Sequence, residues 1–123
     1  MKTILIVDDE YLIANILSFA LEDEGFLTVT AGSGREALEI LDRERPDLII
    51  TDYMMPGMTG LEFADVVRNQ HQGRDVPIML MSGAQGYLGA GRPDLFTRIV
   101  DKPFEIDAMV SVIKSLLPTD HLQ

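Results

Sequence analysis

The fold class is decided by a short apolar run that ends in an acid, Leu48-Ile49-Ile50-Thr51-Asp52. A run of this length, rich in β-branched side chains and without alternating polar residues, predicts a strand that is buried on both faces. A second run of the same kind, Ile4-Leu5-Ile6-Val7, leads directly into Asp8-Asp9-Glu10. Strands buried on both faces are typical of parallel sheets that carry helices on either side.

Helical patterns alternate with strand-like runs along the whole chain. Strands are expected at residues 3–7, 27–30, 48–51, 76–81 and 97–100. Helices are expected at residues 11–24, from Ser33 to before Pro46, from Thr59 towards Gln70, and at 105–117. Two of these helices begin with a capping box, Ser33-Gly34-Arg35-Glu36 and Thr59-Gly60-Leu61-Glu62. This alternation predicts an α/β fold with a five-stranded parallel sheet covered on both faces.

The segment between the fourth and fifth strands departs from this regularity. A fourth helix is expected there, yet the segment 83–93 contains four glycines and ends in Pro93. Each glycine inside a helix costs about 1 kcal/mol relative to alanine. Three of them would cancel most of the stability that a two-turn helix could gain. We therefore expect the fourth helix to be short or irregular.

Composition narrows the function classes. The chain has 123 residues, which suits one domain, and we expect this domain to cover 1–118, with a frayed tail over 119–123. The net charge of −10 disfavours direct binding to nucleic acid or to an anionic membrane surface. The absence of cysteine excludes disulfides and thiolate metal sites. The sequence has no run long enough to span a membrane, so we expect a cytoplasmic protein.

Polar residues stand at the ends of the predicted strands, where parallel sheets bind their ligands. They are Asp8 and Asp9 after the first strand, Asp52 after the third, Ser82 after the fourth and Lys102 after the fifth. Carboxylates crowded together repel by about 4 kcal/mol per pair at 4 Å and an effective dielectric near 20, so a cation is expected among them. Oxygen ligands alone suit Mg²⁺, ahead of Mn²⁺ or Ca²⁺.

These residues could bind a metal ion and attack a phosphoryl group. Asp9, Asp52 and the backbone carbonyl of Met54 fit the few protein ligands that Mg²⁺ takes. A carboxylate can also act as a nucleophile towards phosphorus, with Lys102 and Ser82 placed to stabilise the developing charge. Each residue alone has an ordinary explanation as a helix cap, a turn or a solvated side chain. The occurrence of all of them at the strand ends of one sheet favours a functional site.

These motifs together resemble the receiver domain of bacterial two-component response regulators. The similarity extends over essentially the whole chain, through the segments 4–10, 46–60, 77–84 and 100–104. The resemblance implies a flavodoxin-like (βα)₅ three-layer sandwich with strand order 2-1-3-4-5. It also implies a switch that catalyses only its own phosphorylation and dephosphorylation, with no other enzymatic activity.

The resemblance also implies a role for each site residue. Asp52 would accept the phosphoryl group, Asp9 would bind Mg²⁺ directly, and Asp8 would act mainly through metal-bound water. Met54 would offer its backbone carbonyl to the metal, while Ser82 and Lys102 would each bind a phosphoryl oxygen. The implied donor is a histidine kinase or a histidine phosphotransfer protein, and the implied output is binding to a downstream protein that the sequence leaves unknown. Many relatives carry Tyr or Phe where this chain has Ile99, which puts their aromatic switching movement in doubt here.

Three other functions compete with this interpretation. A phosphatase of the haloacid-dehalogenase type needs an acid two residues after its nucleophile, and Met54 stands there after Asp52. A flavodoxin needs a hydroxyl- and glycine-rich phosphate loop after the first strand, where Asp8-Asp9-Glu10 would repel phosphate. A receiver-like protein-interaction module that works without phosphorylation also remains open.

Overall fold

The computed structural model describes residues 1–70, 75–83 and 86–117, and within them one parallel sheet runs through the molecule. Its five strands lie in the order β2-β1-β3-β4-β5. The strands are β1 (Thr3–Val7), β2 (Leu27–Ala31), β3 (Leu48–Asp52), β4 (Ile78–Ser82) and β5 (Arg98–Asp101). The helices are α1 (Tyr11–Asp23), α2 (Gly34–Leu41), α3 (Gly60–Gln70), α4 (Gly86–Ala90) and α5 (Ile106–Leu116). The predicted fold class and strand order are confirmed.

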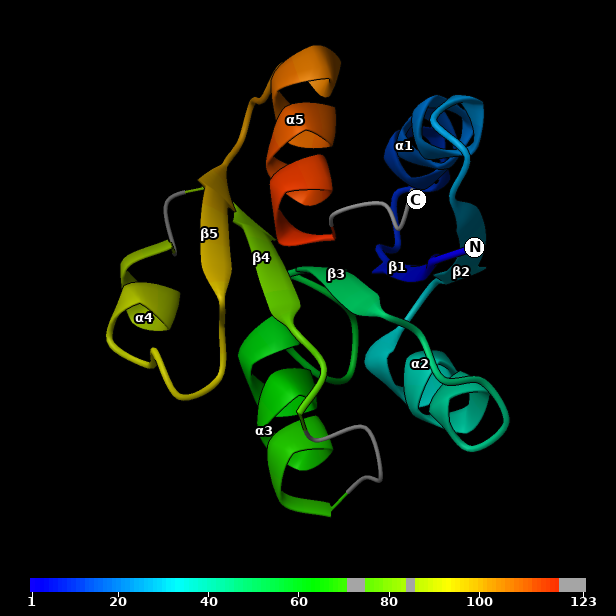
Figure 1. The fold of residues 1–123 in the computed structure, drawn as a ribbon. Coiled ribbons are helices and arrows are strands. Elements are labelled where there is room, and N and C mark those ends of the chain that lie inside the picture. The colour runs from blue at the N-terminus through cyan, green and yellow to red at the C-terminus, as the bar shows by residue number, and fades with distance from the viewer. Residues whose placement is uncertain (71–74, 84–85, 118–123) are drawn as a thin grey trace.

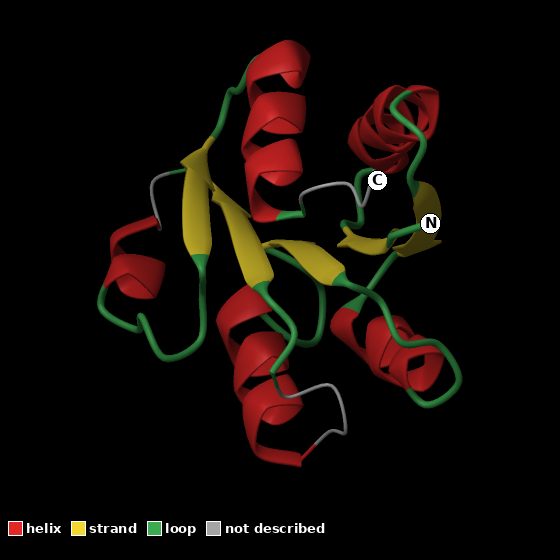
Figure 2. Cartoon of the chain, viewed as in Figure 1, coloured by secondary structure: helices red, strands yellow, loops and turns green. Residues whose placement is uncertain are grey.

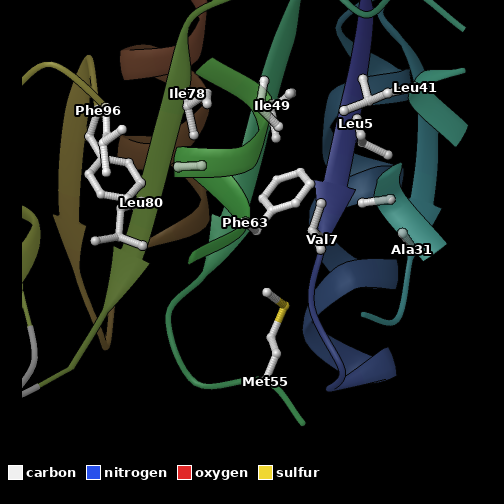
Figure 3. Close-up of a cluster of buried hydrophobic side chains, with 14 of the residues drawn as sticks. Leu5, Val7, Ala31, Leu41, Ile49, Met55, Phe63, Ile78, Leu80 and Phe96 are labelled. Carbon is white, nitrogen blue, oxygen red and sulfur yellow. The ribbon is translucent and has the colours of Figure 1, made fainter. Parts of the chain in front are cut away.

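Helices cover both faces of the sheet and enclose two apolar cores (Figures 1 and 2). One core lies under α1 and α5 and takes Ile4, Ile6 and Ile50 from the sheet. The other lies on the opposite face, where Phe63 of α3 packs among Val7 and Ile49 (Figure 3). Every residue of β3 and β4 is buried, as their continuous apolar sequences predict.

The predicted capping residues make hydrogen bonds at the starts of α2 and α3, but the reciprocal capping box is complete only in α3. The Ser33 hydroxyl accepts a hydrogen bond from the N–H of Glu36 at 3.1 Å, and the Thr59 hydroxyl accepts one from the N–H of Glu62 at 3.1 Å. The Glu62 carboxylate in turn accepts from the Thr59 N–H at 2.9 Å, which completes the reciprocal pair. In α2 the returning glutamate bonds instead to the N–H of Gly32, at 2.7 Å. These bonds fix where each helix begins.

The fourth helix is short, as the glycines predict. It has 5 residues and lies against the outer half of the sheet, beside β4 and β5. A side chain at Gly89 would meet the side chains of Leu80 and Ile99, at 2.6 Å and 3.1 Å from an added Cβ. The absence of a Cβ at Gly89 therefore allows α4 to pack closely on the sheet. The expected frayed tail lies outside the described residues.

Arg68, in the last turn of α3, joins three segments at the amino ends of β4 and β5. Its guanidinium donates hydrogen bonds to the carbonyl oxygen of Val76, just before β4, and to that of Leu95, before β5, the second at 2.8 Å. Burial lowers the pKa of this guanidinium from its usual value, while the Asp75 and Asp94 carboxylates oppose the shift. The group therefore acts as an internal clamp between α3 and the two strands.

The observed element bounds differ from the predicted ones by a few residues. The fourth strand begins at Ile78 instead of residue 76, and Asp52 and Ser82 are the last residues of their strands instead of the residues that follow. Among the described residues, the longest helix is too short to cross a bilayer.

Candidate functional site

The carboxyl ends of the central strands bring the predicted site residues together. Thr51 of β3 pairs with Val7 of β1, so Asp52 ends β3 one residue beyond that pair, level with Asp8. On the other side, Ser82 of β4 stands beside the end of β5, and its carbonyl oxygen accepts the N–H of Lys102 at 2.8 Å. The parallel register alone therefore gathers these groups at one edge of the sheet, as predicted.

Asp52 is buried, and a cation is paired with it. The residue is 5% exposed, and its Oδ1 lies 2.8 Å from the Nζ of Lys102. The loop after β3 turns back sharply, because the N–H of Gly60 donates to the carbonyl oxygen of Tyr53 at 2.8 Å. A Cβ at position 60 would overlap the backbone carbonyl of Asp52. The start of α3 therefore fixes the backbone that carries the Asp52 carboxylate.

Asp8 is more deeply buried than Asp52 and less well satisfied. It is 1% exposed, and its Oδ1 accepts the N–H of Glu10 at 2.9 Å. Its Oδ2 is buried and has no hydrogen-bond partner among the described residues. Burial raises the pKa of Asp8 to about 6; the Glu10 N–H opposes this shift and the charge of Asp52 adds to it. A buried carboxylate oxygen without a hydrogen-bond partner is costly, and a bound cation or water would satisfy it.

Lys102 is shared between two carboxylates. Besides its contact with Asp52, its Nζ lies 3.5 Å from the Oε1 of Glu10. Burial lowers the pKa of Lys102, but the hydrogen bond and charge of Asp52, together with Asp8 and Glu10, outweigh it and leave the pKa above its usual value. The ammonium group therefore stays charged and is the counter-ion of the cluster.

Carboxylate oxygens of Asp8, Glu10 and Asp52 lie within 4.8 Å of one another, an arrangement suited to a metal ion. The pocket above them has a volume of about 220 Å³ and is lined by Asp9, Glu10, Asp52, Tyr53, Met54, Gly83 and Lys102. The oxygen-only donor set and the unpartnered Oδ2 of Asp8 both fit a hard divalent cation. The predicted ligands Asp9 and Met54 line this pocket, and their direct binding to the metal stays a prediction.

Ser82 lies at the edge of this arrangement. It is 1% exposed, and its hydroxyl donates to the carbonyl oxygen of Gly83 at 3.3 Å. The pocket is lined at this point by Gly83 instead. The predicted bond from Ser82 to a phosphoryl oxygen therefore requires its hydroxyl to turn or move, and it stays a prediction.

Glu10 is the residue of the cluster to which sequence reasoning gave no role. The sequence places it directly after the two predicted acids and directly before the helix expected from residue 11. The structure puts Glu10 at the N-cap of α1 without a side-chain capping bond, and turns its carboxylate towards Lys102. The sequence carries no signal for this orientation, because β1 ends at Val7 and the chain bends at Asp9 before α1 begins.

The comparisons with known proteins agree with this geometry. The sequence matches the response regulator receiver domain family over residues 4–114. It is 35% identical to the sporulation initiation phosphotransferase F of Bacillus subtilis, with 95% of this chain and 94% of that protein covered. It is 36% identical to the probable transcriptional regulatory protein TcrX of Mycobacterium tuberculosis, of which it covers only 49%. The chain thus spans the whole of some relatives and about half of others.

Solved structures show the same fold. The chemotaxis response regulator CheY4 of Vibrio cholerae superposes with a TM-score of 0.85 at 34% identity, covering 95% of this chain and 99% of that one. The response regulator TrrA of Thermotoga maritima, solved in complex with Mg²⁺–BeF, gives 0.84 at 36% identity, covering 95% and 100%. Because the family model matches residues 4–114 and these structures share the fold over nearly the whole chain, this chain belongs to the family of response regulator receiver domains.

Proposed function

We propose that this chain accepts a phosphoryl group on Asp52 in the presence of Mg²⁺, and that the modification switches a surface that binds a downstream protein. The observation that carries the proposal is the buried Asp52 carboxylate, paired with Lys102 at 2.8 Å in a pocket that opens to solvent. We further propose that the chain later catalyses hydrolysis of its own phosphoryl group. It has no other enzymatic activity in this proposal.

The donor is phosphohistidine on a histidine kinase or a histidine phosphotransfer protein. An oxygen of Asp52 forms a bond to phosphorus while the bond between phosphorus and the imidazole nitrogen breaks. The imidazole keeps the electron pair, and the product is an aspartyl phosphate. Lys102 moves from the Asp52 carboxylate to a phosphoryl oxygen, and Ser82 donates to another once its hydroxyl leaves the Gly83 carbonyl.

Mg²⁺ would neutralise charge on the phosphoryl oxygens during transfer. The proposed ligands are Asp9, Asp52 and the backbone carbonyl of Met54, with Asp8 acting through water; Mn²⁺ would serve in its place. The unpartnered Oδ2 of Asp8 supports this proposal, since a metal-bound water would supply the missing hydrogen bond.

An exposed apolar stripe on α1 supports a protein donor. Leu12 is 77% exposed, Ile16 51% and Phe19 66%, and their spacing places them along one side of the helix. Beside them an apolar pocket is lined by Ile13, Ile16, Lys102, Pro103, Phe104 and Ile106, so that Lys102 belongs to both pockets. Apolar side chains gathered in this way mark protein interaction sites. A cytoplasmic location follows in the proposal, because such donors act there.

The test is to incubate the protein with Mg²⁺ and acetyl phosphate and to record its intact mass over time. We expect a gain of one phosphoryl group that requires Mg²⁺ and is absent from Asp52→Asn. Lys102→Arg keeps the positive charge but changes its geometry, and should slow the gain without abolishing the acceptor. No gain under conditions that modify another receiver would remove the acceptor role. That result would favour the alternative of an interaction module that works without phosphorylation.

A further inference from the structure

Glu10 stands at the mouth of the pocket, in a position that helix capping does not explain. It is the N-cap residue of α1, but its side chain makes no capping hydrogen bond. Its carboxylate instead lies 3.5 Å from the Nζ of Lys102 and belongs to the cluster with Asp8 and Asp52. The side chain is 59% exposed, whereas that of Asp52 is 7% exposed. Glu10 is therefore the part of the cluster that an approaching molecule meets first.

The charge around the pocket is strongly negative. Among the described residues, Asp9, Glu10 and Asp52 line it, Asp8 lies beneath it, and Lys102 is the cation that faces them. A divalent cation would still leave more negative than positive charge at the site. The repulsion felt by an incoming anion rises in proportion to its own charge. Because Glu10 is exposed, its contribution is screened by salt more than that of the buried acids.

We propose that Glu10 is a specificity-determining residue that discriminates against small, doubly charged phosphodonors in favour of a protein-borne phosphoryl group; this inference rests on the proposed phosphorylation of Asp52. Acetyl phosphate, a dianion at neutral pH, is too small to make contacts outside the pocket that would offset this repulsion. A donor protein has the apolar stripe of α1 as a docking surface, and that contact offsets the repulsion. Glu10 thus lowers stray phosphorylation by metabolic acyl phosphates without blocking the protein donor.

Glu10 also competes with Asp52 for Lys102. The ammonium group lies 2.8 Å from Asp52 and 3.5 Å from Glu10, so it is drawn partly towards the mouth. Removing the Glu10 charge leaves Lys102 to the acceptor and to the incoming phosphoryl oxygens. Both effects act in the same direction, because each makes the site more favourable for an anion when Glu10 is neutral.

The experiment compares the wild type with Glu10→Gln, and uses Glu44→Gln as the matched control. Glu44 is exposed in the loop between α2 and β3, which leads into the amino end of β3, whereas the pocket lies at the carboxyl ends of the strands. Its replacement therefore changes the net charge without touching the pocket. Calorimetric titration with Mg²⁺ first sets a saturating concentration for each variant. Initial phosphorylation rates are then measured by intact mass with acetyl phosphate, a dianion, and with phosphoramidate, which carries one net negative charge, at low and high salt.

We expect Glu10→Gln to raise the second-order rate constant for acetyl phosphate by about three- to tenfold at low salt, and that for phosphoramidate by only about two- to threefold. Both increases should shrink at high salt, and Glu44→Gln should match the wild type. Equal increases for the two donors, no increase, or loss of Mg²⁺ binding in Glu10→Gln would overturn the proposed role. If neither donor phosphorylated the wild type, the proposed function itself would be wrong. This outcome is distinguishable from failure of the Glu10 proposal, because it is seen with the wild type alone.

Discussion

The neighbouring strands β3 and β4 are both completely buried, yet the helices that follow them are built differently. After β3, which carries Asp52, comes α3 with 11 residues, a reciprocal capping box and a backbone contact through Gly60. After β4, which ends at Ser82, comes α4 with 5 residues, held close to the sheet because Gly89 lacks a side chain. The acceptor side is therefore fixed by hydrogen bonds and backbone contact, and the hydroxyl side by side-chain packing that can rearrange.

The largest effect is expected from Gly60→Ala on the acceptor side. The new Cβ would overlap the carbonyl oxygen of Asp52, and backbone cannot yield as a side chain does. We expect a loss of about 3 kcal/mol or more in the free energy of unfolding, measured by urea denaturation. Gly32→Ala is the matched control, because its nearest neighbours would lie 3.6 Å from the new atom. Similar stabilities for the two variants would contradict the contact.

Asp8→Asn tests the buried acid that lies beside Asp52. In the absence of divalent cations, we expect this variant to be more stable than the wild type. The pKa of Asp8 is raised to about 6 by burial, so its ionised form destabilises the folded state, increasingly as the pH rises through 6. We expect the free energy of unfolding of Asp8→Asn to exceed that of the wild type by up to about 2.7 kcal/mol at pH 8, because a shift of roughly two pH units is worth about 1.36 kcal/mol per unit. The difference should shrink as the pH falls from 6 towards 4 and vanish below about pH 3, where Asp8 is protonated in both the folded and the unfolded state.

Free energies of unfolding from urea denaturation at about pH 8, 6 and 3 would test this trend. Asp101→Asn is the control, because Asp101 is an exposed acid at the end of β5. Saturating Mg²⁺ should reduce the advantage of Asp8→Asn at pH 8, because the cation stabilises the ionised carboxylate of the wild type. If the stability advantage of Asp8→Asn over the wild type grew as the pH fell, the result would contradict a raised pKa of Asp8 in the folded state.

Thr59→Ala should have a smaller effect, because it removes only the cap of α3. The hydroxyl that accepts the Glu62 N–H is lost, and such caps contribute about 1 kcal/mol. Thr59→Ser keeps the hydroxyl and should stay close to the wild type in thermal unfolding. If Thr59→Ala unfolds like Thr59→Ser, the capping box is not what fixes the acceptor side.

The smallest net effect is expected from Gly89→Ala on the hydroxyl side. Alanine favours the helix by about 1 kcal/mol, while the added methyl group pushes against the side chain of Leu80 at a similar cost. The variant should therefore unfold within about 1 kcal/mol of the wild type. In a Leu80→Val background, which removes the closest atom, the same substitution should become stabilising. A loss as large as that of Gly60→Ala would show that α4 is held as rigidly as α3.

The sequence predicted the elements more completely than the contacts between side chains. The apolar runs, the two capping boxes and the glycines of the fourth helix each act through neighbours in the chain, so the pattern alone revealed them. The strand-end positions of Asp8, Asp52, Ser82 and Lys102 followed from the parallel topology. The inward turn of Glu10 and the unpartnered oxygen of Asp8 did not, because they depend on which way side chains point after a strand ends. The close approaches at Gly60 and Gly89 depend on tertiary packing and leave no local signal.

The bonds from Arg68 have a mechanical consequence for the sheet. They fasten the amino ends of β4 and β5, through the carbonyls of Val76 and Leu95, to the end of α3. The opposite ends of these strands carry Ser82 and lead into Lys102. Each strand is thus fastened near its amino end by Arg68, and a site residue lies at or just beyond its carboxyl end. A displacement at the carboxyl ends would therefore be taken up within the strands, which have 5 and 4 residues, or passed to the neighbouring β3 and to α4, more readily than it would move the fastened amino ends.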